Sequence, residues 1–131
     1  MRILVAALAL WLAACASSQT GPLEPLVVGG ERFFKLEWQV DQSRGRPVVF
    51  GYILNDWGLP ASGVRILVEG VGPDGQLLGQ QLAWVGSLTP GTRAYFEVPA
   101  EQRAPAYRVR VFSFDWVLGD DFRRRRRDHL R

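Results

Sequence analysis

The chain has 131 residues and a formal net charge of +3, with one cysteine and one histidine. A single cysteine excludes an intramolecular disulfide, and a single histidine excludes a histidine-rich metal site. The charge is uneven: residues 15–122 carry 9 Lys and Arg against 12 Asp and Glu, whereas residues 123–131 carry six Arg and one Asp. The basic character therefore belongs to the C-terminal tail, and the body of the chain is mildly acidic.

The first 14 residues have the order of a secretory signal. Met1-Arg2 gives a positive start, and an apolar run follows from Ile3 to Leu12. As a helix, the apolar residues 3–14 would span about 18 Å, which is short of the ~30 Å hydrocarbon thickness of a bilayer. We therefore expect a cleaved signal peptide rather than a transmembrane anchor.

The end of this signal, Leu12-Ala13-Ala14-Cys15, resembles the lipobox of bacterial lipoproteins. The resemblance implies that residues 1–14 are removed, and that Cys15 becomes the first mature residue and carries lipid, with acyl chains such as palmitate. A secretory signal without lipid, cleaved near Ala14 or Ala16, is the alternative. Ala16 after the cysteine resembles the sorting pattern for the outer membrane.

The mature chain divides into three parts. Residues 15–30 are rich in Ser, Gly and Pro without apolar periodicity, which predicts a flexible tether. Residues 31–117 are enough for one domain, and residues 118–131 form an Arg-rich tail.

Apolar residues alternate with polar ones along the domain, as in half-buried strands. Gly72-Pro73-Asp74-Gly75 is a strong hairpin signal, because Pro presets φ and Gly supplies a positive φ. Short strands joined by such turns predict an all-β fold, a single immunoglobulin-like antiparallel β-sandwich of about six to seven strands. The expected strands are residues 34–40, 48–54, 64–68, 77–85, 93–98 and 107–116.

Part of this pattern resembles the bacterial FxLYD-type domain over residues 48–113. The similar segments are Phe50-Gly51-Tyr52-Ile53-Leu54-Asn55, Asp74-Gly75-Gln76-Leu77-Leu78-Gly79, Leu88-Thr89-Pro90-Gly91 and Tyr107-Arg108-Val109-Arg110-Val111. Val68-Glu69-Gly70-Val71-Gly72 stands in the stretch before the hairpin, where the motif that names the family is missing. The resemblance implies an extracytoplasmic β-sandwich and no particular substrate.

The last expected strand has aromatic residues on an unexpected face. If Tyr107, Val109 and Val111 point into the core, strict alternation exposes Phe112, Phe114 and Trp116. A bulge near Ser113, or cover from residues 117–122, would hide these rings; otherwise they form a patch for a partner.

If the six strands alternate in direction, the start of the first strand and the end of the sixth lie at the same end of the sandwich. We call this argument strand parity. We therefore expect the lipid tether and the Arg tail to be neighbours, together with Trp57, Trp84 and Trp116. These Trp residues would either bind a membrane interface or close the end of the core.

The sequence offers no catalytic constellation. His129 lies in the tail, and the acidic residues have turn or strand-end explanations, so we expect no metal, no cofactor and no enzymatic activity. The alternative is a small periplasmic carbohydrate-acting enzyme that uses carboxylates, for which Glu69 and Glu97 would have to meet across the sheets.

The tail contains an unbroken block of five arginines: Arg123, Arg124, Arg125, Arg126 and Arg127. Such a block stays solvated and binds anionic lipid or the phosphates of lipopolysaccharide, or it is a solvated terminus without a partner. Nucleic acid is not expected as a partner of an envelope protein. The sequence therefore predicts a lipid-anchored protein of the bacterial cell envelope, at the outer membrane and facing the periplasm. Its sandwich would bind or scaffold other envelope components, such as an envelope protein.

Overall fold

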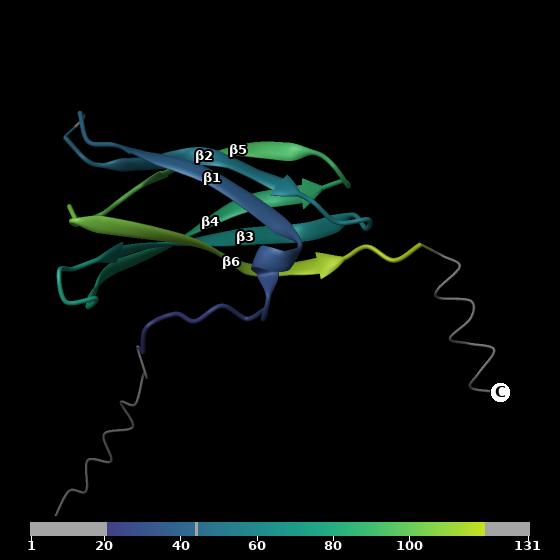
Figure 1. Ribbon diagram of the computed structural model, residues 1–131, viewed down its shortest axis with the longest axis horizontal. Helices are drawn as coiled ribbons and strands as arrows, with labels where there is room; N and C mark the ends of the chain where they lie inside the picture. The colour runs from purple at the N-terminus through teal and green to yellow at the C-terminus, as the bar shows by residue number, and fades with distance from the viewer. Residues whose placement is uncertain (1–20, 44, 120–131) are drawn as a thin grey trace, which may run out of the picture.

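The computed structural model describes residues 21–43 and 45–119, and this part of the chain is all-β (Figure 1). All six expected strands are present, with ends within three residues of the predicted ones. A short 3-10 helix, η1 (Gly30–Arg32), precedes them. The strands are β1 (Phe34–Asp41), β2 (Val48–Asn55), β3 (Ala61–Val71), β4 (Leu77–Leu88), β5 (Arg93–Pro99) and β6 (Ala106–Trp116).

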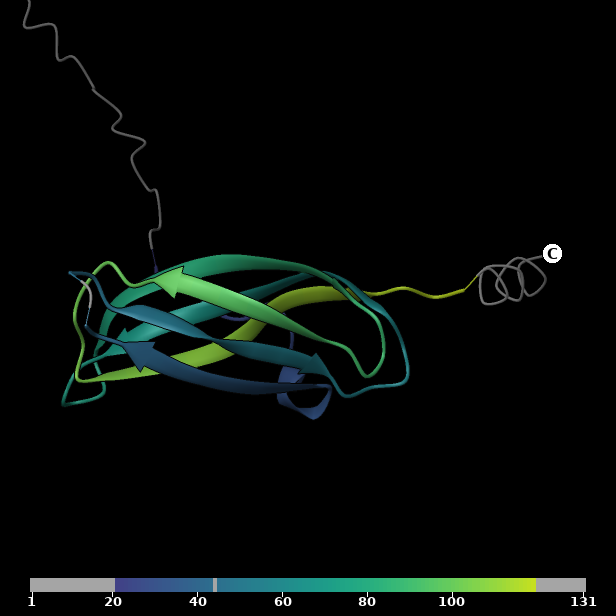
Figure 2. The same ribbon diagram turned by 90° about the horizontal axis from the view of Figure 1, so that it is seen from above.

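The strands form two antiparallel three-stranded sheets, in the orders β1-β2-β5 and β4-β3-β6. The sheets lie face to face, and in Figure 2 the first covers the second. The chain crosses between the sheets after β2, after β4 and after β5. The predicted β-sandwich is therefore confirmed, with an immunoglobulin-like order of strands.

Tyr107 adds a further immunoglobulin-like feature at the start of β6. Its hydroxyl donates to the carbonyl of Gln102 at 3.0 Å and accepts from the N–H of Ala104 at 3.0 Å. A tyrosine at this corner that binds backbone a few residues upstream is a hallmark of immunoglobulin-like sandwiches. It fixes the connection from β5 to β6.

The core lies between the sheets and is made by alternate residues of their strands. Each sheet buries branched aliphatic side chains, as expected for half-buried strands. Among the buried members are Val49, Ile53, Val64, Ile66, Val68, Phe96, Val98 and Val111. Aromatic rings close one end of this core, where Phe34 stacks on Trp116 and meets Phe114 edge to face.

A β-bulge in β6 explains how its aromatic residues become buried. Ile66 pairs with Val111, whereas the preceding residue Arg65 pairs with Ser113, so Phe112 is the extra residue. After the bulge, Phe114 and Trp116 turn toward the core. Of the alternatives that the sequence left open for these rings, the structure shows the bulge near Ser113.

Buried Asn55 holds two loops at this same end. Its side-chain amide donates to the carbonyls of Leu59 and Leu88, and its side-chain oxygen accepts from the N–H of Trp57. All hydrogen-bonding groups of a buried amide are therefore used, as burial requires.

The expected hairpin between β3 and β4 is also present, with Gly75 at φ 79°.

Residues 21–29, here called the N-terminal strap, lie against the outer face and edge of the sheet β4-β3-β6 (Figure 1). The N–H of Leu26 donates to the carbonyl of Phe112 at 2.8 Å, which partly covers the open edge of β6. The stretch expected as a flexible tether, residues 15–30, is thus docked in its described part.

The strap also changes where the chain leaves the domain. The first residue of β1 and the last of β6 do lie at one end, as strand parity requires. However, the strap runs back from there, so the described chain begins toward one end of the long axis and ends beyond the other (Figure 1). The described start of the strap and residue 119 are therefore not neighbours, whereas Cys15 and the arginines 123–127 of the expected arrangement lie outside the described residues.

Gly51 allows the backbones of β1 and β2 to approach each other closely. A Cβ at this position would collide with the backbone of Glu37 and Trp38. Gly51→Ala should therefore lower the free energy of unfolding by about 1–3 kcal/mol, as for other overpacked positions. Gly79→Ala is the matched control, because a Cβ there meets nothing within 4 Å. Urea unfolding of both variants measures the difference, and equal stability would contradict the packing described here.

Candidate functional site

A row of polar side chains crosses the outer face of the sheet β4-β3-β6. Glu69 on β3 pairs in register with Gln80 on β4 and with Arg108 on β6. Alternation along β3 directs Ile66 and Val68 into the core, so Glu69 points outward. Arg110 lies two residues beyond Arg108 and therefore on the same face.

Although it points away from the core, Glu69 is only 1% exposed. Its Oε1 accepts from Nε of Arg108 at 3.0 Å and from Nε of Arg110 at 2.8 Å, and Nη2 of Arg110 lies 2.7 Å away as an ion-pair contact. Its Oε2 accepts from the amide of Gln80 at 3.1 Å. The carboxylate is thus held by three hydrogen bonds and by ion pairs with two arginines.

The titration of Glu69 reflects two opposed effects. Burial acts to raise the pKa of this carboxyl, but hydrogen bonds from Arg108, Gln80 and Arg110 outweigh it and leave the pKa below its usual value. The same contact, chiefly the hydrogen bond to Glu69, raises the pKa of Arg108. Glu69 is therefore ionised at neutral pH.

Gln80 links the cluster of Glu69, Arg108 and Arg110 to the N-terminal strap. Its amide donates to the carbonyl of Leu23 at 2.8 Å, and its oxygen accepts from the N–H of Leu23 at 2.7 Å. One side chain thus holds the strap backbone on one side and Glu69 on the other. The strap and the long side chains around Glu69 together remove that carboxylate from water.

This arrangement is suited to holding the strap and not to proton transfer. Every oxygen of Glu69 already accepts a hydrogen bond, and two cations keep it ionised. The carboxylate pair considered from the sequence does not form. Glu97 lies on the outer face of the other sheet, where it accepts from the hydroxyl of Tyr95 at 2.6 Å.

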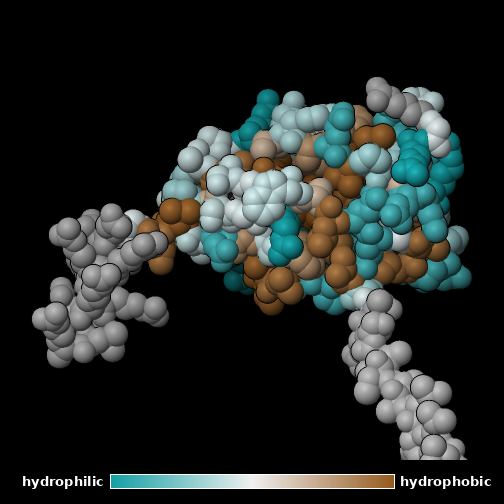
Figure 3. Space-filling model, turned by 180° about the vertical axis from the view of Figure 1, so that it is seen from behind, coloured by the Kyte–Doolittle hydropathy of each residue, from teal (hydrophilic) through white to brown (hydrophobic). Residues whose placement is uncertain are grey.

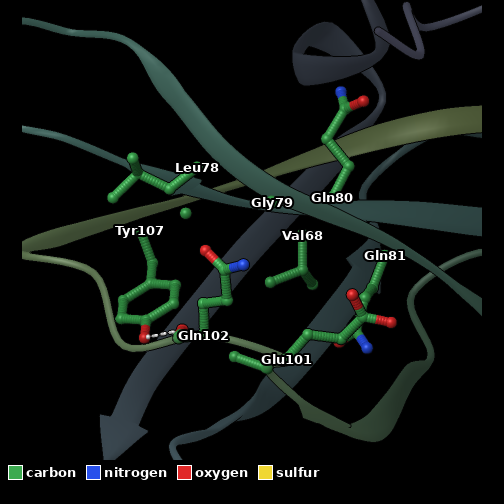
Figure 4. A pocket seen from close by; sticks show the side chains of 10 residues that line it. Val68, Leu78, Gly79, Gln80, Gln81, Glu101, Gln102 and Tyr107 are labelled. Atoms are coloured by element: carbon green, nitrogen blue, oxygen red, sulfur yellow. Dashed lines mark hydrogen bonds between the residues drawn. The ribbon is translucent and has the colours of Figure 1, made fainter. Parts of the chain in front are cut away.

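A small cavity lies between the sheets beside β4 and the β5–β6 connection (Figure 4). Val68, Gln81 and Tyr107 are among the residues that line it, and its volume is about 20 Å³. A cavity of this size holds about one water molecule. It is too small for an organic substrate.

A shallow hollow of about 660 Å³ lies on the outer face of the sheet β1-β2-β5. Its lining includes Glu37, Gln39, Phe50, Tyr52 and Tyr95. The rings of Tyr52 and Tyr95 meet edge to face at 5.4 Å. This face therefore presents aromatic and hydrogen-bonding groups together, which is a common composition of binding surfaces.

The three Trp residues singled out from the sequence have different surroundings. Trp116 packs into the aromatic end of the core, and Trp57 contacts Phe33 edge to face at 4.8 Å. Trp84 is instead 71% exposed on β4. The structure thus joins Trp57 and Trp116 through Phe33 and leaves Trp84 apart.

Other predicted site residues lie outside the described residues, namely Cys15 and the arginines 123–127. Within residues 21–43 and 45–119, no three His, Cys, Asp or Glu side chains gather as metal ligands would. The same residues include no helix with the length and apolarity that crossing a bilayer needs. No family model, curated protein or solved structure matches the chain.

Glu69→Gln tests the cluster. The change removes the negative charge between two arginines and should lower the free energy of unfolding by about 1.5–3 kcal/mol, the range for hydrogen bonds to charged groups. Glu37→Gln is the control, because Glu37 is exposed in the middle of β1 and should change stability by no more than about 0.5 kcal/mol. Chemical denaturation at pH 7 measures both, and equal effects would contradict a role for the buried carboxylate.

The stability difference between wild type and Glu69→Gln should also depend on pH. A lowered pKa in the folded state means that Glu69 stabilises the fold above its unfolded value of about 4.5. This contribution is lost as pH falls through the lower pKa of the folded state. The stability difference between wild type and Glu69→Gln should therefore shrink below about pH 4.5, and a difference that grows on acidification would refute the assignment.

Proposed function

We propose that this protein is a lipid-anchored lipoprotein of the bacterial envelope, held at the outer membrane and facing the periplasm. Its β-sandwich would bind or scaffold other envelope components and not perform catalysis. The observation that carries the proposal is the place of the only cysteine in the chain, at the end of Leu12-Ala13-Ala14-Cys15 after an apolar run. The FxLYD-type resemblance of residues 48–113 belongs to the same proposal, and the sandwich supports it as far as the fold goes.

The docked strap limits how far the domain could lie from the proposed anchor. Leu23, which is hydrogen-bonded to Gln80, lies eight residues after Cys15. At ~3.4 Å per residue, this stretch spans at most about 27 Å. A lipid on Cys15 would therefore keep the domain close to the membrane surface.

Two surfaces are suited to contacts beyond the anchor. The hollow with Tyr52 and Tyr95 lies on the sheet opposite the strap, so it stays open to a partner in the envelope. The arginines of residues 123–127 would add contacts to anionic lipid or to lipopolysaccharide phosphates, each worth ~1 kcal/mol near such a surface.

Cys15→Ser tests the anchor. Without the sulfur no lipid can be attached, so the protein should move from the membrane fraction to the soluble fraction and take up no labelled palmitate. Ser17→Ala, two residues away, should keep both the label and the membrane fraction. Fractionation that is unchanged in Cys15→Ser, together with no label in the parent protein, would contradict the proposal.

A further inference from the structure

The outer face of the sheet β4-β3-β6 has an exposed apolar surface that the cluster around Glu69 does not use. Trp84 is 71% exposed, Leu26 is 70% exposed and Val28 is 98% exposed. Leu82, also exposed, lies two residues before Trp84 and so on the same face of β4. In Figure 3, brown, hydrophobic side chains are scattered among teal ones over the molecule, and some of them lie in its lower part, where this sheet and the strap are.

A β-bulge fixes Trp84 on this face. The pairing of β3 with β4 shifts between Ala61 and Arg65, and Gly63 and Gly86 have φ of 59° and 99° there. A Cβ on either glycine would lie within 4 Å of the Trp84 ring. One edge of the ring therefore lies against the sheet, while most of the side chain is exposed.

We propose that the domain lies with this strap-covered face of β4-β3-β6 against the headgroups of its own membrane, with Trp84, Leu26 and Val28 at the interface. This inference rests on the proposed lipid at Cys15. It specifies which face of the domain contacts the lipid, and therefore which face is turned to the periplasm.

The path of the chain is the first argument for this orientation. The strap is fixed at Leu23 by Gln80 and at Leu26 by the carbonyl of Phe112. A lipid eight residues before Leu23 would hold the domain from the outer side of this sheet. The tether therefore enters on the same face as the exposed apolar side chains, four residues along β4 from Trp84.

The chemistry of the face is the second argument. Trp combines an apolar ring with a polar N–H and prefers the membrane interface, and apolar neighbours next to an anchor suit the same place. The face also carries Arg65, Arg108 and Arg110, together with the carboxylate of Glu69, which is paired, and that of Glu24, whose charge acts on Arg108. The face is therefore mixed in charge, and its exposed apolar side chains carry this argument.

An end-on orientation through the aromatic end fits less well. Trp116 is engaged with Phe33 and Phe34 in the core, and Trp57 is packed on Phe33. That end is also where the C-terminal tail leaves, away from the start of the strap (Figure 1). Side-on contact requires no change in the fold.

Site-directed fluorescence tests the orientation in the lipidated protein. Because Cys15 would be blocked by lipid, one added cysteine gives one labelled position. The three positions are Leu82→Cys on the proposed contact face, Gly58→Cys at the aromatic end and Gln39→Cys on the outer face of β1-β2-β5. The protein is reconstituted in phosphatidylethanolamine and phosphatidylglycerol vesicles that contain headgroup-level nitroxide lipid. We expect strong quenching of the label at 82, weak quenching at 58 and none at 39.

The contrary outcomes are distinct. Lipidated protein with equal quenching at the three positions, or with the strongest quenching at 58, would overturn the orientation and leave the anchor standing. Absence of quenching at all three positions would mean that none of these faces lies at the headgroups, which also overturns the orientation. A mass without lipid on Cys15 would overturn the proposed function and this inference with it.

Two further variants distinguish an orientation set by this face from an orientation set by the C-terminal tail. Val28→Ser with Trp84→Ala should reduce quenching at position 82, with an unfolding midpoint close to that of the parent because both side chains are exposed. Truncation after Phe122 should leave the order of quenching unchanged. If the truncated protein loses the preference for position 82, the tail and not this face sets the orientation.

Discussion

The burial of Glu69 is the constraint on which the outer side of one sheet depends. A carboxylate that leaves water costs several kcal/mol unless donors replace its hydration. Arg108 and Arg110 supply the charge, and Gln80 supplies a further donor that also binds Leu23 of the strap. The strap and the ion cluster therefore stabilise each other, because the strap limits access of water to the cluster and the cluster orients Gln80.

This coupling gives the two sheets different outer faces. On β4-β3-β6 the strap crosses a charged row and leaves Trp84 exposed beside it. On β1-β2-β5 no described segment crosses in the same way, and a hollow with Tyr52 and Tyr95 is open. A domain tethered through the strap would thus present one face to its anchor and the other to the space beyond. The proposed anchoring and the proposed partner surface are compatible for this reason.

Local pattern was enough to predict the sandwich but not the strap. Alternation identified each strand, and the exposed aromatic residues predicted from strict alternation pointed to the bulge beside Ser113. The strap has no apolar period, and its bonds join Leu23 to Gln80 across 57 residues, through a side chain and not through a strand ladder. No rule of local sequence contains that contact. The only signal in the sequence was the position of three charged residues: Glu69 faces outward on one strand, and Arg108 and Arg110 face outward on another. This signal becomes informative only when β3 and β6 are known to pair.

The central claim, that the strap is docked on the sheet, is tested most directly by amide hydrogen exchange. The measurement uses the soluble Cys15→Ser chain and follows the N–H groups of Leu23 and Leu26. Docking predicts that both exchange far more slowly than in an unstructured peptide, and that Gln80→Ala releases the N–H of Leu23 without changing the amides of β2. Exchange of both amides at the rate of an unstructured peptide would contradict the account.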